Sequence, residues 1–259
     1  MFILEQPKSI KMKRDASKTN PISKQLIIKY FFEFVVIILG VSISFWINER
    51  DRVKKKEKLH QQDTIDLISD LKTDEKNFES VLNSINEGEK KTRRLIRVIE
   101  KAKAKTINYD TFVDSIISIG YVYGYSTFFM NNATYKSLIS NGRIQLFPNQ
   151  LNTEIKKYYE YVSKRVDDNN HIVDEVTLNY YNNIHPFTLY LSNNGNDLDR
   201  KTYKEYFYDQ EIKKRYLSST FLMGTSALRN RIKIHKQQIT MYIRARNVLE
   251  EKIETYTSP

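Results

Sequence analysis

Four histidines and several groups of carboxylates are the side chains in this sequence that could bind a metal or move a proton. Histidine and carboxylate ligands three or four residues apart share one face of a helix. His171 lies three and four residues before Asp174 and Glu175, and Glu57 lies three before His60. Iron sites in helical bundles need Glu-x-x-His on two helices and further inward carboxylates. We therefore expect solvated side chains here and predict no metal site and no cofactor.

Two further groups have helical spacing. Asp63, Asp66, Asp70 and Asp74 form an acidic ridge. We expect this ridge to be a solvated face opposite the core, and a cation site is the alternative. His235 falls within an apolar stripe, which predicts a hydrogen-bonded core histidine.

Signatures of catalysis and of nucleic-acid binding are weak. No serine lies in a GxSxG turn, and the one SxxK, Ser69 to Lys72, lacks SDN and KTG partners. We predict no enzyme activity and no catalytic residue. Basic residues from Arg229 to Lys236, with Arg244 and Arg246, could touch phosphates, but three glutamates follow closely. Nucleic-acid binding needs a continuous basic face, so we predict no nucleic-acid partner.

The segment between Thr106 and Pro148 is rich in glycine and aromatic residues. It lacks the spacing of a phosphate-binding loop, and we expect it to pack against helix ends. It also contains a candidate interaction loop for a protein partner not identified by the sequence, comprising Tyr121, Tyr123, Tyr125 and Tyr135. The alternative is a ligand-binding or enzymatic site near the segment from Tyr121 to Phe129.

These candidates must be positioned by helices, and the most apolar of them extends from Leu26 to Ile47. The 18 residues from Tyr30 to Ile47 span about 27 Å as a helix, close to the ~30 Å apolar thickness of a bilayer. Tyr30 and Trp46 lie near opposite ends, as interfacial aromatic residues do. Charged residues follow directly where a signal-peptide cleavage site would need small ones. We predict an uncleaved transmembrane helix over residues 26–47, and a buried core helix is the alternative.

One face of this span favours association. Gly40 and Ser44 follow Glu33 by seven and eleven positions, so all three lie within about 20° of one line, whereas Ser42 points away. Gly40 and Ser44 form a small-xxx-small pair, which allows close helix approach in lipid. Glu33 either reaches interfacial water or pairs with Lys29 of its own helix, or it meets Lys29 or a polar group of a neighbouring copy. We predict a parallel homo-oligomer, extended by an apolar seam over residues 65–85.

The distribution of basic residues around the predicted span bears on which side of a membrane each end of the chain lies. Much of the net charge of +11 flanks the span, where anionic lipid headgroups explain it. Residues 1–25 are polar and basic, and we expect a flexible tail. Within about 20 residues of the span, six basic residues lie on each side, and those on the N-terminal side are Lys11, Lys13, Arg14, Lys18, Lys24 and Lys29. The positive-inside rule therefore gives a tie. Because uncleaved anchors with basic leaders commonly export the domain after the span, we expect the inner membrane of a bacterium and a periplasmic C-terminal domain.

The remaining residues, 48–259, predict one helical domain. Glycine and proline are scarce, and apolar residues recur with helical spacing over residues 58–105, 149–184 and 202–256. The helical repeat of apolar residues keeps its phase across Gly88, which favours one continuous helix over residues 58–105. The alternative is an interruption at Gly88, which would give a helical hairpin. Shorter helices are expected from Asp110, as N-cap, to Ile119 and over residues 132–140, with a loop over residues 185–200. The fold class is all-α: an elongated antiparallel bundle with coiled-coil-like seams.

Two stretches resemble an uncharacterised family of bacterial single-span membrane proteins that is known only as a domain of unknown function. The first consists of Tyr30, Glu33, Leu39-Gly40-Val41 and Trp46-Ile47-Asn48-Glu49, and the second runs from Asn132-Ala133-Thr134-Tyr135 through Asn141-Gly142 to Leu146. The resemblance implies a membrane anchor with a helical domain and transfers no catalytic residue. The sequence thus favours a non-enzymatic, membrane-anchored interaction protein, of scaffold or sensor type.

Overall fold

The computed structural model describes residues 24–120, 122, 126–194 and 200–257. Every regular element in these residues is helical, and none of them is a strand, which confirms the all-α prediction. The chain divides into two compact units, residues 1–57 and residues 58–259. The predicted tail over residues 1–25 lies outside the described residues except for Lys24 and Gln25, which belong to the first helix.

Helix α1 (Lys24–Lys103) contains both the apolar segment 26–47 and the first amphipathic stretch. It continues through Gly88, so the prediction of one helix there is confirmed and the hairpin is excluded. Its end is set by Lys105, whose φ of 57° is left-handed, and the N–H of Thr106 bonds to the carbonyl of Lys101 at 3.0 Å. This six-to-one bond satisfies a carbonyl that the helix leaves open, with lysine in the position that glycine usually takes.

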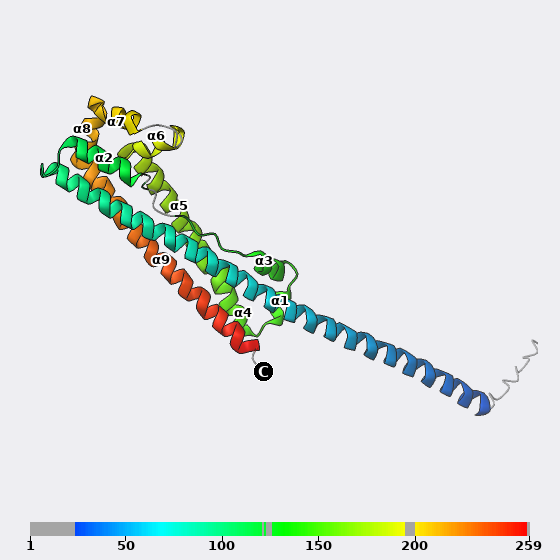
Figure 1. Ribbon diagram of the computed structural model, residues 1–259. Helices are drawn as coiled ribbons and strands as arrows, with labels where there is room; N and C mark the ends of the chain where they lie inside the picture. The colour runs from blue at the N-terminus through cyan, green and yellow to red at the C-terminus, as the bar shows by residue number, and fades with distance from the viewer. Residues whose placement is uncertain (1–23, 121, 123–125, 195–199, 258–259) are drawn as a thin grey trace, which may run out of the picture. The chain divides into compact units, whose positions relative to one another are not determined.

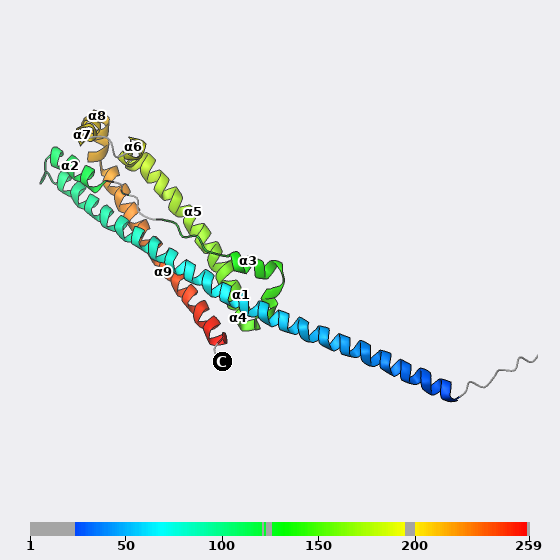
Figure 2. The same ribbon diagram turned by 45° about the vertical axis from the view of Figure 1, so that its right-hand side comes forward.

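The predicted helix 149–184 is helical throughout. It consists of α4 (Asn149–Lys156), the π-helical η2 (Lys157–Val162), α5 (Ser163–Asn179) and the π-helical η3 (Tyr180–Ile184). Within the unit 58–259, this helix, the second part of α1 and α9 (Ser219–Thr257) lie side by side in both views (Figure 1, Figure 2). The predicted bundle of long helices is therefore present in this unit.

The prediction of one helix over residues 202–256 is wrong in its first part. The chain instead forms α7 (Arg200–Tyr208), α8 (Gln210–Leu217) and α9. Asp209 caps α8, because its side chain accepts from the N–H groups of Glu211 and Ile212. Ser218 is extended, and its hydroxyl accepts from the N–H of Phe221. Capping side chains thus interrupt the helix without glycine or proline.

The expected loop over residues 185–200 is also partly helical, since α6 (Phe187–Asn194) begins directly after Pro186. Helix α2 (Tyr109–Ile119) matches its prediction, but its N-cap is Asn108 and not Asp110: the Asn108 side chain accepts from the N–H of Thr111. Helix α3 (Ala133–Ser140) also matches, and Gly142, with φ of 66°, ends that turn before η1 (Arg143–Leu146).

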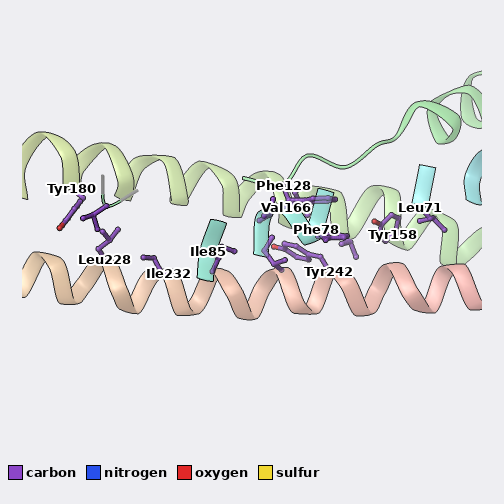
Figure 3. Packing of buried hydrophobic residues seen from close by; sticks show 14 of the residues in the cluster. Leu71, Phe78, Ile85, Phe128, Tyr158, Val166, Tyr180, Leu228, Ile232 and Tyr242 are labelled. Atoms are coloured by element: carbon purple, nitrogen blue, oxygen red, sulfur yellow. The ribbon is translucent and has the colours of Figure 1, made fainter. Parts of the chain in front are cut away.

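One apolar core holds the three long helices together. Figure 3 shows Leu228 of α9 beside Tyr180, and Tyr242 of α9 beside Val166 of the neighbouring helix. Phe78 of α1 stacks on Phe128, with ring centroids 3.8 Å apart, and both rings are almost fully buried. Phe128 therefore packs the described residues just before α3 against α1, because burying these rings removes a large apolar area from water.

Candidate functional site

The acidic ridge of α1 is buried, contrary to the expected solvated face. Asp63, Asp70 and Asp74 are 4%, 8% and 0% exposed, and only Asp66 lies partly open beside Gln62. Asp74 lies three residues after Leu71 and four before Phe78, so it occupies a position in the core stripe itself. That spacing was readable from the sequence, and it was the signal for burial.

Each buried carboxylate holds a part of the segment 131–143. Asp74 accepts from the backbone N–H of Asn131 at 2.8 Å, and Asp70 accepts from the Asn131 side-chain amide at 2.8 Å and from the N–H of Thr134 at 3.0 Å. The Thr134 bond places a carboxylate of α1 at the N-terminus of α3, where Asn132 gives no side-chain cap. A carboxylate there satisfies an open N–H and meets the positive end of the helix.

The third carboxylate makes an ion pair with two hydrogen bonds. Asp63 accepts from Nε and Nη2 of Arg143 at 2.8 and 3.0 Å, and Nη2 of Arg143 also donates to the hydroxyl of Ser137. A bidentate arginine–carboxylate pair fixes the relative orientation of the two side chains as well as pairing their charges. We refer to Asp63, Asp70 and Asp74 with their partners on residues 131–143 as the carboxylate clasp.

Polar contacts at Leu71 and Asp74 connect α1 to the other two long helices. The Tyr158 hydroxyl donates to Oδ2 of Asp74 at 2.8 Å. Arg246 of α9, 3% exposed, donates from Nε to the carbonyl of Leu71 at 2.9 Å and pairs with Glu250 at 2.7 Å. Burial raises the pKa of Asp74 to about 6, although the two hydrogen bonds and the charge of Arg246 act in the opposite direction.

Tyr135 is part of this packed region and not of an exposed loop. Its ring is 7% exposed and stacks on Tyr159 with centroids 4.9 Å apart, and its hydroxyl donates to Glu160. Burial and the Glu160 carboxylate raise its pKa. Tyr135 is thus unavailable to a partner, which corrects its assignment to the interaction loop. Tyr121, Tyr123 and Tyr125 lie outside the described residues.

Two of the four histidines, His171 and His235, fit the expectations from sequence. The expectation of a solvated His60 is wrong, because its ring packs on Phe147 with centroids 4.5 Å apart and its Nε2 lies 2.9 Å from the Tyr256 hydroxyl. His235 is fully buried, with 2.8 Å between Nδ1 and the Asn169 amide, which confirms a hydrogen-bonded core residue. His171, Asp174 and Glu175 are exposed, as predicted. Among the described residues, no group of three or more histidine and carboxylate side chains could hold a metal ion.

Sequence reasoning missed His185, which is fully buried. Its Nδ1 lies 2.9 Å from the Tyr216 hydroxyl among the rings of Tyr180, Phe187 and Phe221. Burial lowers its pKa to about 3, so it is neutral at physiological pH. A polar residue directly before Pro186 at a helix end gave no signal of such burial.

The residues of the predicted association face lie in the unit 1–57. Glu33 pairs with Lys29 of its own helix at 3.9 Å, both side chains being exposed, and the Ser44 hydroxyl donates to the carbonyl of Gly40 at 2.9 Å. A Cβ added at Gly40 would meet nothing within 4 Å, so this face is open. The expected extension over residues 65–85 is wrong, because Leu71, Phe78 and Ile85 are buried in the chain's own core and Ile65 is exposed.

In residues 24–57, the apolar side chains are uncovered. The large ones from Leu26 to Ile47 are 45% to 72% exposed, with the exception of Val35, which is partly covered. Helix α1 is the described helix that is long and apolar enough to cross a membrane, judged by length and composition. It is therefore a candidate membrane span.

Comparisons with family models, with curated proteins and with solved structures found no match for this chain. The resemblance to a family of bacterial single-span proteins accordingly stays a prediction, and no residue role is transferred from a relative.

Proposed function

We propose that the chain is a non-enzymatic interaction protein, anchored in a membrane by residues 26–47 and presenting the helical unit 58–259 to a partner. The observation that carries this proposal is the uncovered apolar surface of residues 26–47. An exposed apolar surface of this extent on a helix requires lipid or protein to cover it. The segment is about as long as a bilayer is thick and carries aromatic residues near both ends.

The internal contacts of the helical unit support an interaction role. Its polar groups are used to join its own segments: the carboxylate clasp holds α3 and Arg143, and Arg246 joins α9 to α1. The clasp carboxylates are buried and hydrogen-bonded, which suits positioning rather than attack on a substrate. The unit therefore acts as a preformed scaffold.

For location, we propose the inner membrane of a bacterium, with residues 48–259 in the periplasm. The support is the basic leader before an uncleaved apolar segment. A fluorescent reporter that matures only in the cytoplasm, fused after Pro259, is expected to remain dark, while the same reporter fused before Met1 fluoresces. Fluorescence from the C-terminal fusion would reverse the orientation.

We further propose that the span forms a parallel dimer through the face of Glu33, Gly40 and Ser44. The chain has no cysteine, so any disulfide-linked dimer of a single-cysteine variant must form through the introduced residue. Gly40→Cys should form disulfide-linked dimers in membranes much more efficiently than Ser42→Cys, because position 42 lies about 160° around the helix. The measurement is non-reducing electrophoresis after mild oxidation. Equal cross-linking at both positions, or none at either, would remove the case for a specific face.

A further inference from the structure

The helical unit has a long shallow groove between α9 and the helix formed by α4, η2 and α5. Three hollows follow one another along it: one beside Leu151 and Thr255, one beside Lys157 and Arg244, and one beside Ile172 and Gln238. Val248 lines the first and the second. We call this surface the α5/α9 groove.

The groove faces away from α1. Arg246 of α9 reaches the carbonyl of Leu71 on α1. At about 100° per residue, Arg244 and Val248 lie about 160° from Arg246 around α9. The three long helices therefore leave one side of the α5–α9 pair without a covering helix.

An apolar stripe follows α9 along this side. Ile234, Met241 and Val248 are spaced seven residues apart and are 43%, 55% and 44% exposed. Across the groove, Tyr161 and Ile172 are 60% and 42% exposed. A seven-residue repeat of exposed apolar side chains is the pattern against which a neighbouring helix packs.

The charges around the stripe are mainly basic. The three hollows are lined by five basic residues, Lys157, Lys164, Arg165, Arg244 and Lys252, and by three acidic ones, Glu154, Asp168 and Glu251. Glu154 pairs with Lys252 at 3.0 Å and with Lys157 at 3.6 Å, and setting these three aside leaves Lys164, Arg165 and Arg244 against Asp168 and Glu251. Arg231 borders the groove through its 3.3 Å bond to Asn169, and its Nε–H is buried without a partner.

We propose that the α5/α9 groove binds an amphipathic helix of another protein, with apolar residues on one face and carboxylates flanking them. Apolar residues of that helix cover the stripe, and its carboxylates meet Arg231, Lys164 and Arg244. A second copy of the chain fits less well, because it would bring one basic groove against another. This inference names the surface and the partner class for the interaction role proposed above, and it rests on that role.

The test uses the full chain in detergent micelles, so that it is independent of membrane insertion. The probe is a fluorescein-labelled synthetic helix of about four heptads, with leucine at positions a and d and glutamate at most others. Fluorescence anisotropy is expected to show binding that weakens at least about tenfold in Met241→Asp and in Arg244→Glu. Ile65→Asp, a change at an equally exposed apolar residue of α1, should leave binding unchanged.

Circular dichroism melting of each variant checks that the fold is retained. The proposal is overturned if the acidic helix does not bind, if Met241→Asp binds it as tightly as the parent chain, or if a matched peptide with lysine in place of glutamate binds equally well. Cross-linking of Met241→Cys chains to one another through the groove would also overturn it, in favour of a second copy. None of these outcomes depends on whether residues 26–47 span a membrane.

Discussion

Phe128→Ala is expected to lower the free energy of unfolding of the helical unit by about 3 to 5 kcal/mol. The ring is 0% exposed and stacks on Phe78 of α1, so its removal leaves a cavity between α1 and the segment that leads to the carboxylate clasp. The loss should appear as a lower denaturation midpoint of the full chain in detergent, followed by circular dichroism.

The chain supplies a matched control at the next position. Phe129 is 71% exposed, so Phe129→Ala should change the unfolding free energy by less than about 0.5 kcal/mol. Similar losses in the two variants would mean that the stacking of Phe128 on Phe78 does not fasten this segment to α1.

The second large effect is a pH dependence centred on Asp74. Its pKa is about 6 in the folded chain, against an ordinary value of 3.8. A carboxyl whose pKa is raised on folding binds its proton more tightly in the folded state. The stability that the folded chain gains from this tighter proton binding is therefore fully present below about pH 4 and is lost as the pH rises through 6. From pH 7.5 to pH 4, protonation of Asp74 should favour folding by about 2 to 3 kcal/mol.

Asp74→Asn isolates this contribution from the other titrating groups. Asparagine can still accept from the N–H of Asn131, and it carries no charge beside Asp70, Tyr158 and Arg246. Denaturant unfolding at both pH values gives the stability of each chain. The free energy of unfolding of the parent chain minus that of the variant should be about 2 to 3 kcal/mol larger at pH 4 than at pH 7.5. A difference that is constant with pH, or that moves the other way, would contradict the burial of an ionised Asp74.

The sequence predicted the helices well, because their signal is local. Apolar spacing gave the continuity of α1 through Gly88 and the helical stretch 149–184. The breaks at Asp209 and Ser218 were missed because each depends on a single capping side chain within an otherwise helical pattern. Helix-breaking residues alone could not reveal them.

The clasp was harder to predict because its partners are distant in sequence. Asp70 and Thr134 are 64 residues apart, and Asp74 and Tyr158 are 84 apart. A row of aspartates is normally solvated, since burying a charge is costly without hydrogen-bond donors. The donors come from Asn131, Thr134 and Arg143, and no spacing in the sequence shows that these reach α1. The position of Asp74 within the core stripe was the available clue.

The central claim, that residues 26–47 anchor the chain in a membrane, is tested most directly by flotation. Membranes from bacteria expressing the full chain are washed with alkaline carbonate and floated through a density gradient. The chain should float with the lipid, as should a control with Ile37→Leu and Ile38→Leu. The double variant Ile37→Arg with Ile38→Arg should stay in the dense fractions, because each arginine at the centre of a span costs about 2.5 to 3.5 kcal/mol. Release of the parent chain by carbonate, or flotation of the arginine variant to the same extent, would contradict the membrane anchor.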